Sequence, residues 1–541
     1  MKNAISDIEH ASVEPEVCEE ILYRLKLITQ PNRESVERVK LEVCREKASP
    51  LPRNSELLRF LHEDEAPFLS TLLQNKPVRT ISGVAVIAVM TTPSPCPKDK
   101  PCIYCPGGPK YGVPQSYTGF EPAAMRGQQN LYDPCMQVKS RLEQLKAIGH
   151  SVNKSELIIM GGTFPATSIT YQRSFVKACL DALNGSHSIS LNETKKKAES
   201  SVNRCVGITV ETRPDYCKQK HIDILLNLGI TRIELGVQTL YDNIYKIINR
   251  GHSVQDVVEA SRFVKDSGLK LCYHMMPGLP GSNLKMDYEA FQSIFIDNRF
   301  RPDMLKIYPC LVIEGTELFD LWKKGKYSPH STEETIELLA NIKKIVPKWV
   351  RVMRIQRDIP ANLIMAGVRK SNLRQLVKKR MEERGETCNC IRCREVGHGV
   401  LKRNLKVNTD KIQTKYVEYE ASKGQELFIS IEDVENELII GYLRLRVPSE
   451  KTNRPEISSK SASIVREIKI CGPVVPIGQH NKLSWQHKGY GRQLLGEAER
   501  ISLEEFNRNK IVITSALGTK KYYGQLGYRY DGPYMSKIIL R

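Results

Sequence analysis

Between residues 82 and 342, short apolar runs alternate with longer amphipathic segments, and this alternation constrains the fold more than any other feature. The apolar runs are rich in β-branched residues and lie at 84–90, 156–160, 206–210, 232–237, 269–276 and 304–309. Segments with helical spacing, such as 136–150 and 253–268, separate them. Strands that are apolar on both faces and alternate with helices predict a parallel sheet. Six such units favour a full or partial TIM-type barrel over a two-layer sandwich.

The other parts of the chain differ from this pattern, and 541 residues are too many for one compact core. We predict a small helical region at 1–75, the barrel at 76–342, a basic cysteine-containing linker at 343–415 and an α+β domain at 416–541. In the last segment, apolar runs at 427–433 and 438–447 predict antiparallel strands, and a helix at 492–506 and a strand at 511–516 follow.

Positive charge is concentrated in the predicted linker. The chain has a net charge of +20, and residues 343–415 hold 20 Lys and Arg against 6 Asp and Glu. A polyanion such as RNA is the expected partner, because each neutralised phosphate releases counterions. A basic face that is merely solvated remains the alternative.

Fifteen cysteines occur in a chain whose N-terminus lacks the apolar segment of an export signal. No stretch is long and apolar enough for a membrane span, so we expect a cytoplasmic protein with no membrane partner. Clustered thiols in such a protein usually hold metal.

The first cysteine cluster, Cys96, Cys102 and Cys105, directly follows the first predicted strand. Three thiolates leave one iron of a 4Fe-4S cluster free to bind S-adenosylmethionine (SAM) and pass it an electron. A zinc site with a distant fourth ligand remains the alternative.

Polar residues and glycines follow the next four predicted strands, and in a barrel these strand ends meet at the edge where active sites lie. Each one alone is compatible with a turn or a cap. Their serial placement resembles the radical SAM superfamily, and this resemblance implies a SAM site made by Gly161, Gly162, Glu211, Gln238, Pro277 and Gly278.

The second cysteine cluster has the spacing C-x-C-x2-C at Cys388, Cys390 and Cys393. With Cys310 as a remote fourth thiol, it predicts a tetrahedral structural zinc site. A second iron–sulfur cluster is the rival interpretation, and Cys310 alone is also compatible with a buried, unliganded thiol.

Rare strings in the chain resemble the elongator protein 3 family, the catalytic subunits of Elongator, in its archaeal and bacterial form. The strings are PCIYCPGGP, QSYTGFEP, IIMGGTF, ETRPD, ELGVQT and MMPGLPG, and the resemblance covers the chain from about residue 76 to its end. The five-residue gap between Cys96 and Cys102 is a departure in length. The resemblance implies a radical SAM barrel joined to a C-terminal GCN5-related N-acetyltransferase domain.

The glycine turn before the helix at 492–506 leaves backbone N–H groups free for a pyrophosphate. The resemblance places acetyl-CoA here and implies that Lys154, Tyr522 and Tyr523 take part in catalysis. The implied acetyl-CoA contacts are Lys154, Ile468, Lys469, Ile470, Cys471, Gln486, Gly489, Tyr490, Gly491 and Tyr522. Packing of the two tyrosines and a surface ion pair of Lys154 are the alternatives.

By resemblance, the chain is a tRNA carboxymethyluridine synthase, also described as a tRNA uridine acetyltransferase. It would use a SAM-derived 5′-deoxyadenosyl radical and acetyl-CoA to form 5-carboxymethyluridine at the wobble position, with the barrel mouth facing the acetyl-CoA domain. The implied partners are the anticodon stem-loop and body of tRNA, contacted also by residues 1–75, and an electron-donor protein. A homodimer and other subunits are left open. The alternatives are a histone-type protein lysine acetyltransferase with a structural radical SAM domain, and a non-enzymatic tRNA-binding scaffold.

Overall fold

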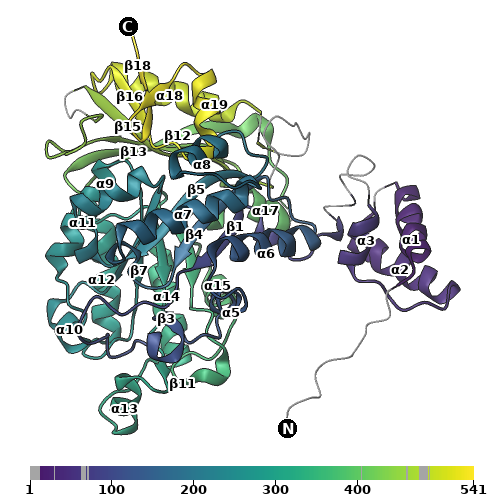
Figure 1. Cartoon of the computed structure of the whole chain (residues 1–541), viewed down its shortest axis with the longest axis horizontal. Coiled ribbons are helices and arrows are strands. Elements are labelled where there is room, and N and C mark those ends of the chain that lie inside the picture. Colours follow the sequence, from purple (N-terminus) through teal and green to yellow (C-terminus); the bar gives the residue numbers. More distant parts are fainter. Residues whose placement is uncertain are drawn as a thin grey trace. The chain divides into compact units, whose positions relative to one another are not determined.

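A computed structural model describes residues 13–29, 31–61, 69, 72–403, 405–457, 461–473, 485–486 and 488–540 (Figure 1). The chain divides into two compact units. The first comprises Met1–Thr80 and Ser140–Val152, and the second comprises Ile81–Lys139 and Asn153–Arg541. Among the described helices, none is long and apolar enough to cross a membrane.

The first unit is helical, as the sequence predicts for residues 1–75, although 1–12 and 62–68 lie outside the described residues. Its helices are α1 (Pro15–Leu27), α2 (Arg33–Glu46) and α3 (Asn54–Phe60). Asn32 and Ser35 form a capping box that begins α2. Apolar side chains spaced three and four residues apart on α1 and α2 form the core, and they are Val17, Ile21, Leu25, Val36, Val39 and Val43.

The second unit contains the predicted parallel sheet, in the order β1-β4-β5-β6-β7-β8-β10. Its strands are β1 (Ala85–Met90), β4 (Lys154–Met160), β5 (Arg204–Thr212), β6 (Arg232–Gln238), β7 (Lys270–Met275), β8 (Met304–Ile307) and β10 (Arg351–Ile355). Every neighbouring pair is parallel. The six predicted strands are confirmed. Strand β10 differs from the prediction, because it lies within residues 343–415, which the sequence analysis assigned to a linker.

Helices lie between the strands of this partial barrel, and one more follows its last strand (Figure 1). They are α5 (Pro122–Gln129), α6 (Pro134–Ala147), α7 (Ile169–Asn184), α8 (Leu191–Ala198), α9 (Gln219–Asn227), α10 (Asp242–Ile247), α11 (Val254–Asp266), α12 (Leu284–Ile296), α13 (Glu317–Lys323), α14 (Thr332–Lys344) and α15 (Leu373–Glu383). Side-chain caps fix several of their starts, as Ser253 does for α11 and Asn283 for α12. Two small hairpins pair β2 (Gly107–Gly108) with β3 (Val113–Gln115), and β9 (Val312–Ile313) with β11 (Ile364–Ala366).

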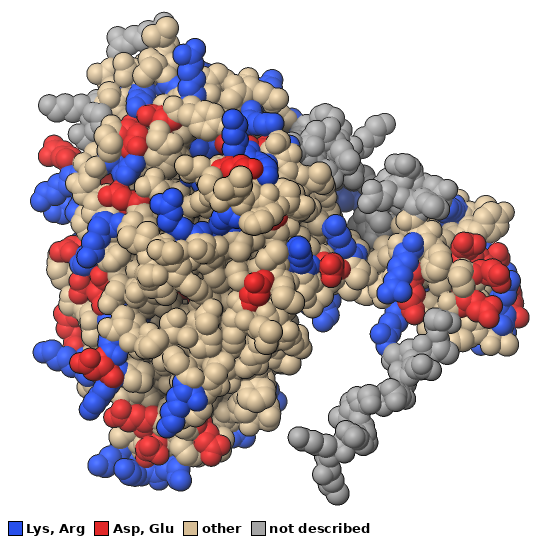
Figure 2. Space-filling model, in the orientation of Figure 1, with Lys and Arg blue, Asp and Glu red and all other residues tan. Residues whose placement is uncertain are grey.

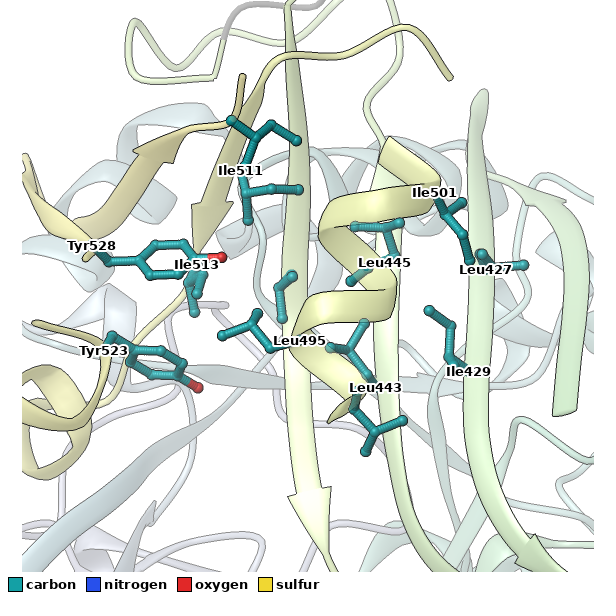
Figure 3. Close-up of a cluster of buried hydrophobic side chains, with 14 of the residues drawn as sticks. Leu427, Ile429, Leu443, Leu445, Leu495, Ile501, Ile511, Ile513, Tyr523 and Tyr528 are labelled. Carbon is teal, nitrogen blue, oxygen red and sulfur yellow. The ribbon is translucent and has the colours of Figure 1, made fainter. Parts of the chain in front are cut away.

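After the short helices α16 (Ile391–Arg394) and α17 (Val396–Arg403), a second sheet follows in the order β12-β13-β14-β15-β16-β18-β17. Its strands are β12 (Ile412–Ala421), β13 (Gly424–Asp433), β14 (Leu438–Val447), β15 (Ala462–Ile470), β16 (Lys510–Ile513), β17 (Arg529–Asp531) and β18 (Tyr534–Ile538). Helices α18 (Tyr490–Glu504) and α19 (Lys520–Gln525) complete this C-terminal domain. Figure 3 shows Leu495 and Ile501 of α18 packed on Leu443, Leu445 and Leu427 of the sheet.

The C-terminal domain packs against the amino-terminal ends of the barrel strands. Asp303 directly precedes β8 and accepts hydrogen bonds of 2.7 and 2.6 Å from Arg466 of β15. Gly229, just before β6, lies against Leu517, which precedes α19. The expectation that the barrel mouth faces this domain is therefore wrong. The mouth lies at the carboxyl ends, and ion pairs between residues far apart in sequence decide which end the domain covers.

Buried ion pairs form this interface. Lys265 Nζ lies 3.3 Å from Asp303 Oδ1 and 3.4 Å from Glu426 Oε1, and Glu426 also accepts a hydrogen bond of 2.7 Å from Arg466. Arg446 joins Glu426 to Asp266 at 2.9 and 2.6 Å. Three acids face three bases, so the buried network is close to neutral. Such a network is stable only when complete, because each charge has lost its hydration.

We predict that Arg466→Met lowers the free energy of unfolding of the second unit by about 3–5 kcal/mol, because Asp303 and Glu426 lose a buried partner. Urea denaturation measures this change. The control is Arg500→Met, which removes a half-exposed ion-pairing arginine on α18 and costs at most about 1 kcal/mol. An equal loss of unfolding free energy in the two variants would show that the buried ion pairs of Arg466 contribute no more than exposed ones.

Candidate functional site

The predicted cluster thiols lie in the loop after β1. Cys102 is buried, and Cys96 and Cys105 are half-buried. Cys105 Sγ lies 3.1 Å from Ser116 Oγ and accepts a hydrogen bond of 3.2 Å from Gln115 Nε2. These thiols do not form a compact single-ion site among the described residues, whose tight ligand groups lie elsewhere. A 4Fe-4S cluster takes one thiolate on each of three irons when the fourth is left open, so three thiols in one loop suit its ligand set.

Two cations surround Cys102. Lys98 Nζ and Arg250 Nη1 each lie 3.7 Å from its sulfur, and Arg250 Nη2 also donates to the Gly236 carbonyl at 2.6 Å. Burial disfavours the thiolate, but Arg250 and Lys98 outweigh burial and hold the pKa of Cys102 below its ordinary value. Thiolates are the form that ligates iron, so this environment suits a metal ligand.

The predicted SAM residues share the carboxyl-end edge of the sheet with the cysteine loop. Gly161 and Gly162 follow β4 with φ of +121° and +103°. A Cβ on Gly161 would lie 2.2 Å from Thr91 Oγ1, so only glycine fits there. Gln238 ends β6 at φ +73°, and its buried Oε1 has no hydrogen-bond partner among the described residues.

The remaining SAM candidates lie at the same edge. Glu211 near the end of β5 accepts a hydrogen bond of 3.0 Å from Tyr117 Oη. Pro277 and Gly278 follow β7, and the Gly278 amide donates to Asp287 at 2.7 Å. The structure thus brings all six candidates to one end of the barrel.

Charged residues fill the barrel interior below this edge. Lys306 of β8 contacts Glu234 of β6 and lies 3.5 Å from Glu211. Glu234 also lies 2.7 Å from His274 Nε2. At the amino-terminal end, Arg232 Nη1 lies 2.6 Å from Glu156 Oε1. An ionic column, defined as Glu156, Arg232, Glu234, His274, Lys306 and Glu211, therefore runs along the lumen.

The central pair of the column, Glu234 and Lys306, is charged. Burial disfavours both charges, yet their attraction keeps the pKa of Glu234 well below its usual range and raises that of Lys306. Glu234, Cys272 and His274 also place ligand atoms within 4.8 Å of one another. Burial raises the pKa of the Cys272 thiol, and Lys306 already neutralises Glu234. These facts argue against a metal ion at this group.

The predicted acetyl-CoA residues lie at the opposite end of the barrel. Lys154 begins β4, and its Nζ lies 2.7 Å from Gln486 Oε1. Burial lowers the pKa of Lys154 to about 8. Gly489 caps α18 in the left-handed region at φ +89°, and Tyr490 and Gly491 form the first turn of that helix. Among the described residues, the N–H groups of Tyr490 and Gly491 have no backbone acceptor, which suits a pyrophosphate.

Strand β15 has a free edge beside this helix. It pairs with β16 only through Ala462–Val465, so among the described residues no strand pairs with the stretch from Arg466 to Ile470 on that side, although the Ile470 carbonyl accepts a hydrogen bond of 3.4 Å from Gln486 Nε2. Ile468, Lys469 and Ile470 lie on this stretch, and Cys471 follows it. An extended ligand arm can pair with such an edge through backbone hydrogen bonds.

The two tyrosines have different environments. Tyr522 is 38% exposed, and a Cβ on Gly491 would lie 3.3 Å from its hydroxyl. Tyr523 is buried in the hydrophobic core beside Tyr528 (Figure 3). The structure therefore gives Tyr523 the packing role that the sequence left as an alternative, and it leaves Tyr522 at the helix start.

The two sites are joined by a single strand. Lys154 begins β4 and Gly161 follows its last residue, so about 20 Å separates them at roughly 3.3 Å per residue. A reaction that uses both candidate sites therefore needs a group that spans the distance between the two ends of the barrel.

In the second cysteine cluster, the sulfurs of Cys388, Cys390 and Cys393 lie within 4.8 Å of one another. Hydrogen bonds from its two neighbours hold the pKa of Cys390 well below its usual value. Cys310 does not join them, which corrects the predicted four-thiol set. It lies in a separate apolar cluster with Cys102, and its amide donates to Pro277 at 2.9 Å.

Sequence reasoning did not identify Glu395 or the ionic column. Glu395 follows α16, contacts Arg351 of β10 and accepts hydrogen bonds from Ser82 at 3.1 Å and Cys471 at 3.6 Å. It therefore ties the cysteine segment to the end of β15. The sequence did contain one signal for the column, because charged residues such as Arg232 and Glu234 occupy alternate positions of an apolar strand and so point to the same face.

The chain matches three protein-family models and is similar to named proteins along most of its length. Models of the Radical SAM superfamily, the Radical_SAM C-terminal domain and the ELP3 N-terminal domain match residues 94–293, 302–383 and 15–81. The chain is 52% identical over 514 residues to a tRNA uridine(34) acetyltransferase of Methanocaldococcus jannaschii, which covers 94% of each chain. It is 44% identical to Elongator complex protein 3 of Saccharomyces cerevisiae, over 91% of this chain and 90% of the yeast protein.

A solved structure is also similar. The archaeal Elp3 of Methanocaldococcus infernus, with residues 1–46 deleted, matches with a TM-score of 0.76 at 48% identity. The match covers 85% of this chain and 100% of that chain. The predicted combination of a radical SAM barrel and an acetyltransferase-like domain is confirmed.

We predict that Lys306→Met lowers the free energy of unfolding by about 3 kcal/mol or more, because Glu234 then loses its closest cation. Denaturant titration measures the loss. Lys246→Met, at an exposed position on α10, is the control and changes stability by less than about 0.5 kcal/mol. A Lys306→Met protein as stable as the control would show that the column contributes nothing to folding.

Proposed function

The chain belongs to the elongator protein 3 family of radical SAM enzymes, and from this premise we propose that it forms 5-carboxymethyluridine at the wobble position of tRNA. The observation that carries the proposal is the presence of two sites at opposite ends of one barrel. One end presents three cysteines and the SAM candidates, and the other presents the glycine turn and free strand edge that suit acetyl-CoA. The named archaeal relative acts on uridine 34 of tRNA.

At the carboxyl-end edge, Cys96, Cys102 and Cys105 would hold a 4Fe-4S cluster. The half-buried loop and the cations at Cys102 fit a negatively charged cluster. When bound, the cluster supplies the electron that cleaves SAM. Gly161 and Gly162 allow close backbone approach, and Glu211 offers a carboxylate to the amino group of SAM.

At the other end, Lys154 and Gln486 would contact acetyl-CoA beside the start of α18. The N–H groups of Tyr490 and Gly491 face a pyrophosphate, and the free edge of β15 aligns the pantetheine arm. Tyr522 lies against Gly491 and would contact the same ligand. Tyr523 would act only by packing behind it.

The tRNA would be held by exposed cations of the predicted linker and by the first unit. Part of the positive charge in the linker is internal, because Arg351 and Arg394 are buried in ion pairs with Glu395 and Glu432. Figure 2 shows Lys and Arg scattered over one face of the molecule rather than gathered in one patch. Scattered cations can grip a phosphate backbone without reading its sequence. A tRNA substrate supports a cytoplasmic location, and the reductive cleavage of SAM would need an electron-donor protein.

We propose that Cys388, Cys390 and Cys393 hold a structural zinc ion without Cys310. The expected metal content is one zinc per chain in the wild type and in Cys310→Ser. Cys390→Ser is expected to lose the zinc, because it removes one of the three clustered thiols. Elemental analysis of the purified proteins measures this. Loss of zinc in Cys310→Ser would contradict this proposal and would show that Cys310 is a zinc ligand.

The test of the function is an anaerobic reaction of iron-reconstituted protein with tRNA, SAM and acetyl-CoA, followed by nucleoside mass spectrometry. We expect 5-carboxymethyluridine only when both cofactors are present, with release of 5′-deoxyadenosine. Cys102→Ala is expected to abolish the product, whereas the control Cys135→Ala, a half-buried thiol outside both clusters, keeps it. Acetylated protein lysines without a modified nucleoside would favour the lysine acetyltransferase alternative.

A further inference from the structure

Arg250 connects the carboxyl end of β6 to the cysteine loop. It lies between α10 and α11, and its side chain is buried, with 8% exposed. Its Nη2 donates a hydrogen bond of 2.6 Å to the Gly236 carbonyl, and its Nη1 donates to Cys102 Sγ at 3.7 Å. A Cβ on Gly236 would lie 2.5 Å from Nη2, so the glycine leaves room for the guanidinium.

Hydrogen bonds between neighbouring residues hold this arginine against the loop. The Ile103 amide donates to the Ile248 carbonyl at 3.2 Å. Asn249 Nδ2 donates to the Lys100 carbonyl at 3.2 Å. The residues that precede Arg250 are therefore fixed to the residues on both sides of Cys102, and the guanidinium is preorganised beside the sulfur.

The charge of Arg250 has no carboxylate partner in the described part of the chain. Other buried arginines of the barrel pair with acids, as Arg213 does with Asp215 at 2.6 Å. For Arg250, the anion beside the guanidinium is the Cys102 thiolate. A buried charge without an anion is costly, so the position of Arg250 indicates an anionic group at this sulfur.

The predicted cluster thiols differ in the donors that they meet. Cys105 accepts a hydrogen bond of 3.2 Å from the neutral amide of Gln115. Among the described residues, Cys102 is the cluster thiol that accepts hydrogen bonds from cations, Arg250 and Lys98. Lys98 is half-buried, whereas Arg250 is buried, so water screens the charge of Arg250 less.

We propose that Arg250 stabilises the reduced form of an iron–sulfur cluster bound at Cys102 and so raises the reduction potential of that cluster. This inference rests on the proposed cluster of three cysteines. Reduction adds one electron and therefore one negative charge, and a cation hydrogen-bonded to a ligand sulfur favours the more negative form. The electron would come from the one-electron donor protein. No bond forms or breaks, and Arg250 itself exchanges neither a proton nor an electron.

A redox titration of the iron-reconstituted protein, without SAM or tRNA, tests the proposal. The reduced cluster is measured by electron paramagnetic resonance (EPR). In Arg250→Gln the amide can still donate to the Gly236 carbonyl, but the charge is lost. We expect the ratio of reduced to oxidised cluster at a fixed potential to fall by about tenfold, which corresponds to about 59 mV for one electron. Arg250→Lys keeps the charge, and its ratio should lie within about threefold of the wild type.

Lys246→Gln is the matched control. It also removes one positive charge, from α10 just before Arg250, but at an exposed position where water and salt screen the charge. Its ratio of reduced to oxidised cluster should change by less than about twofold. A role limited to holding the cysteine loop predicts instead that Arg250→Gln lowers stability without moving the potential.

A second measurement uses the wild type alone. Pulsed EPR of the reduced cluster in protein labelled with 15N-arginine should show magnetic coupling to an arginine nitrogen. In the described part of the chain, Arg250 is the arginine that donates a hydrogen bond to a predicted cluster thiol. This measurement decides the question if Arg250→Gln does not fold or does not bind iron.

The outcomes are distinct. An unchanged potential in Arg250→Gln, or no coupling to an arginine nitrogen in the wild type, would overturn the proposal and leave Arg250 as a contact between β6 and the cysteine loop. If the wild type assembles no reducible 4Fe-4S cluster, the proposed function fails, and this inference fails with it.

Discussion

The arrangement of this molecule depends on one buried set of ion pairs, in which Arg466 of β15 joins Asp303 at the barrel base to Glu426 of the C-terminal sheet. Lys265 completes this centre and contacts both acids. Because unpaired charges in such a place are expensive, the two domains have few alternative ways to pack. The same contacts fix β15 across the amino-terminal end of the barrel, where the predicted acetyl-CoA residues lie.

A second line of charges continues inward from that interface. Arg232, Glu234 and Lys306 connect the base of the lumen to Glu211 at its mouth. The barrel therefore has a packed and charged interior that separates the two candidate sites. The proposed function depends on chemistry that connects these two ends of the barrel.

The parts of the fold that could be predicted from the sequence are those marked by local, repeating patterns of residues. The six apolar runs became strands of the parallel sheet, and the cysteine loop and the residues at the strand ends lie at one edge. Strand β10 escaped prediction because Arg351 and Arg354 interrupt its apolar character. Cys310 was wrongly joined to the second cluster, because spacing along the chain cannot show that the fold separates them. The ion pairs of Arg466 join it to Asp303 and Glu426, which lie 163 and 40 positions away in the sequence, and no local pattern encodes such contacts.

The most direct test of the account is a crystal structure of the anaerobically reconstituted protein with SAM and a non-hydrolysable acetyl-CoA analogue. The account predicts SAM at the carboxyl-end edge beside Cys102 and Gly161, and the analogue at the opposite end, with its pyrophosphate at the start of α18 and its thioester arm along β15. Both ligands bound at the same end of the barrel would contradict it.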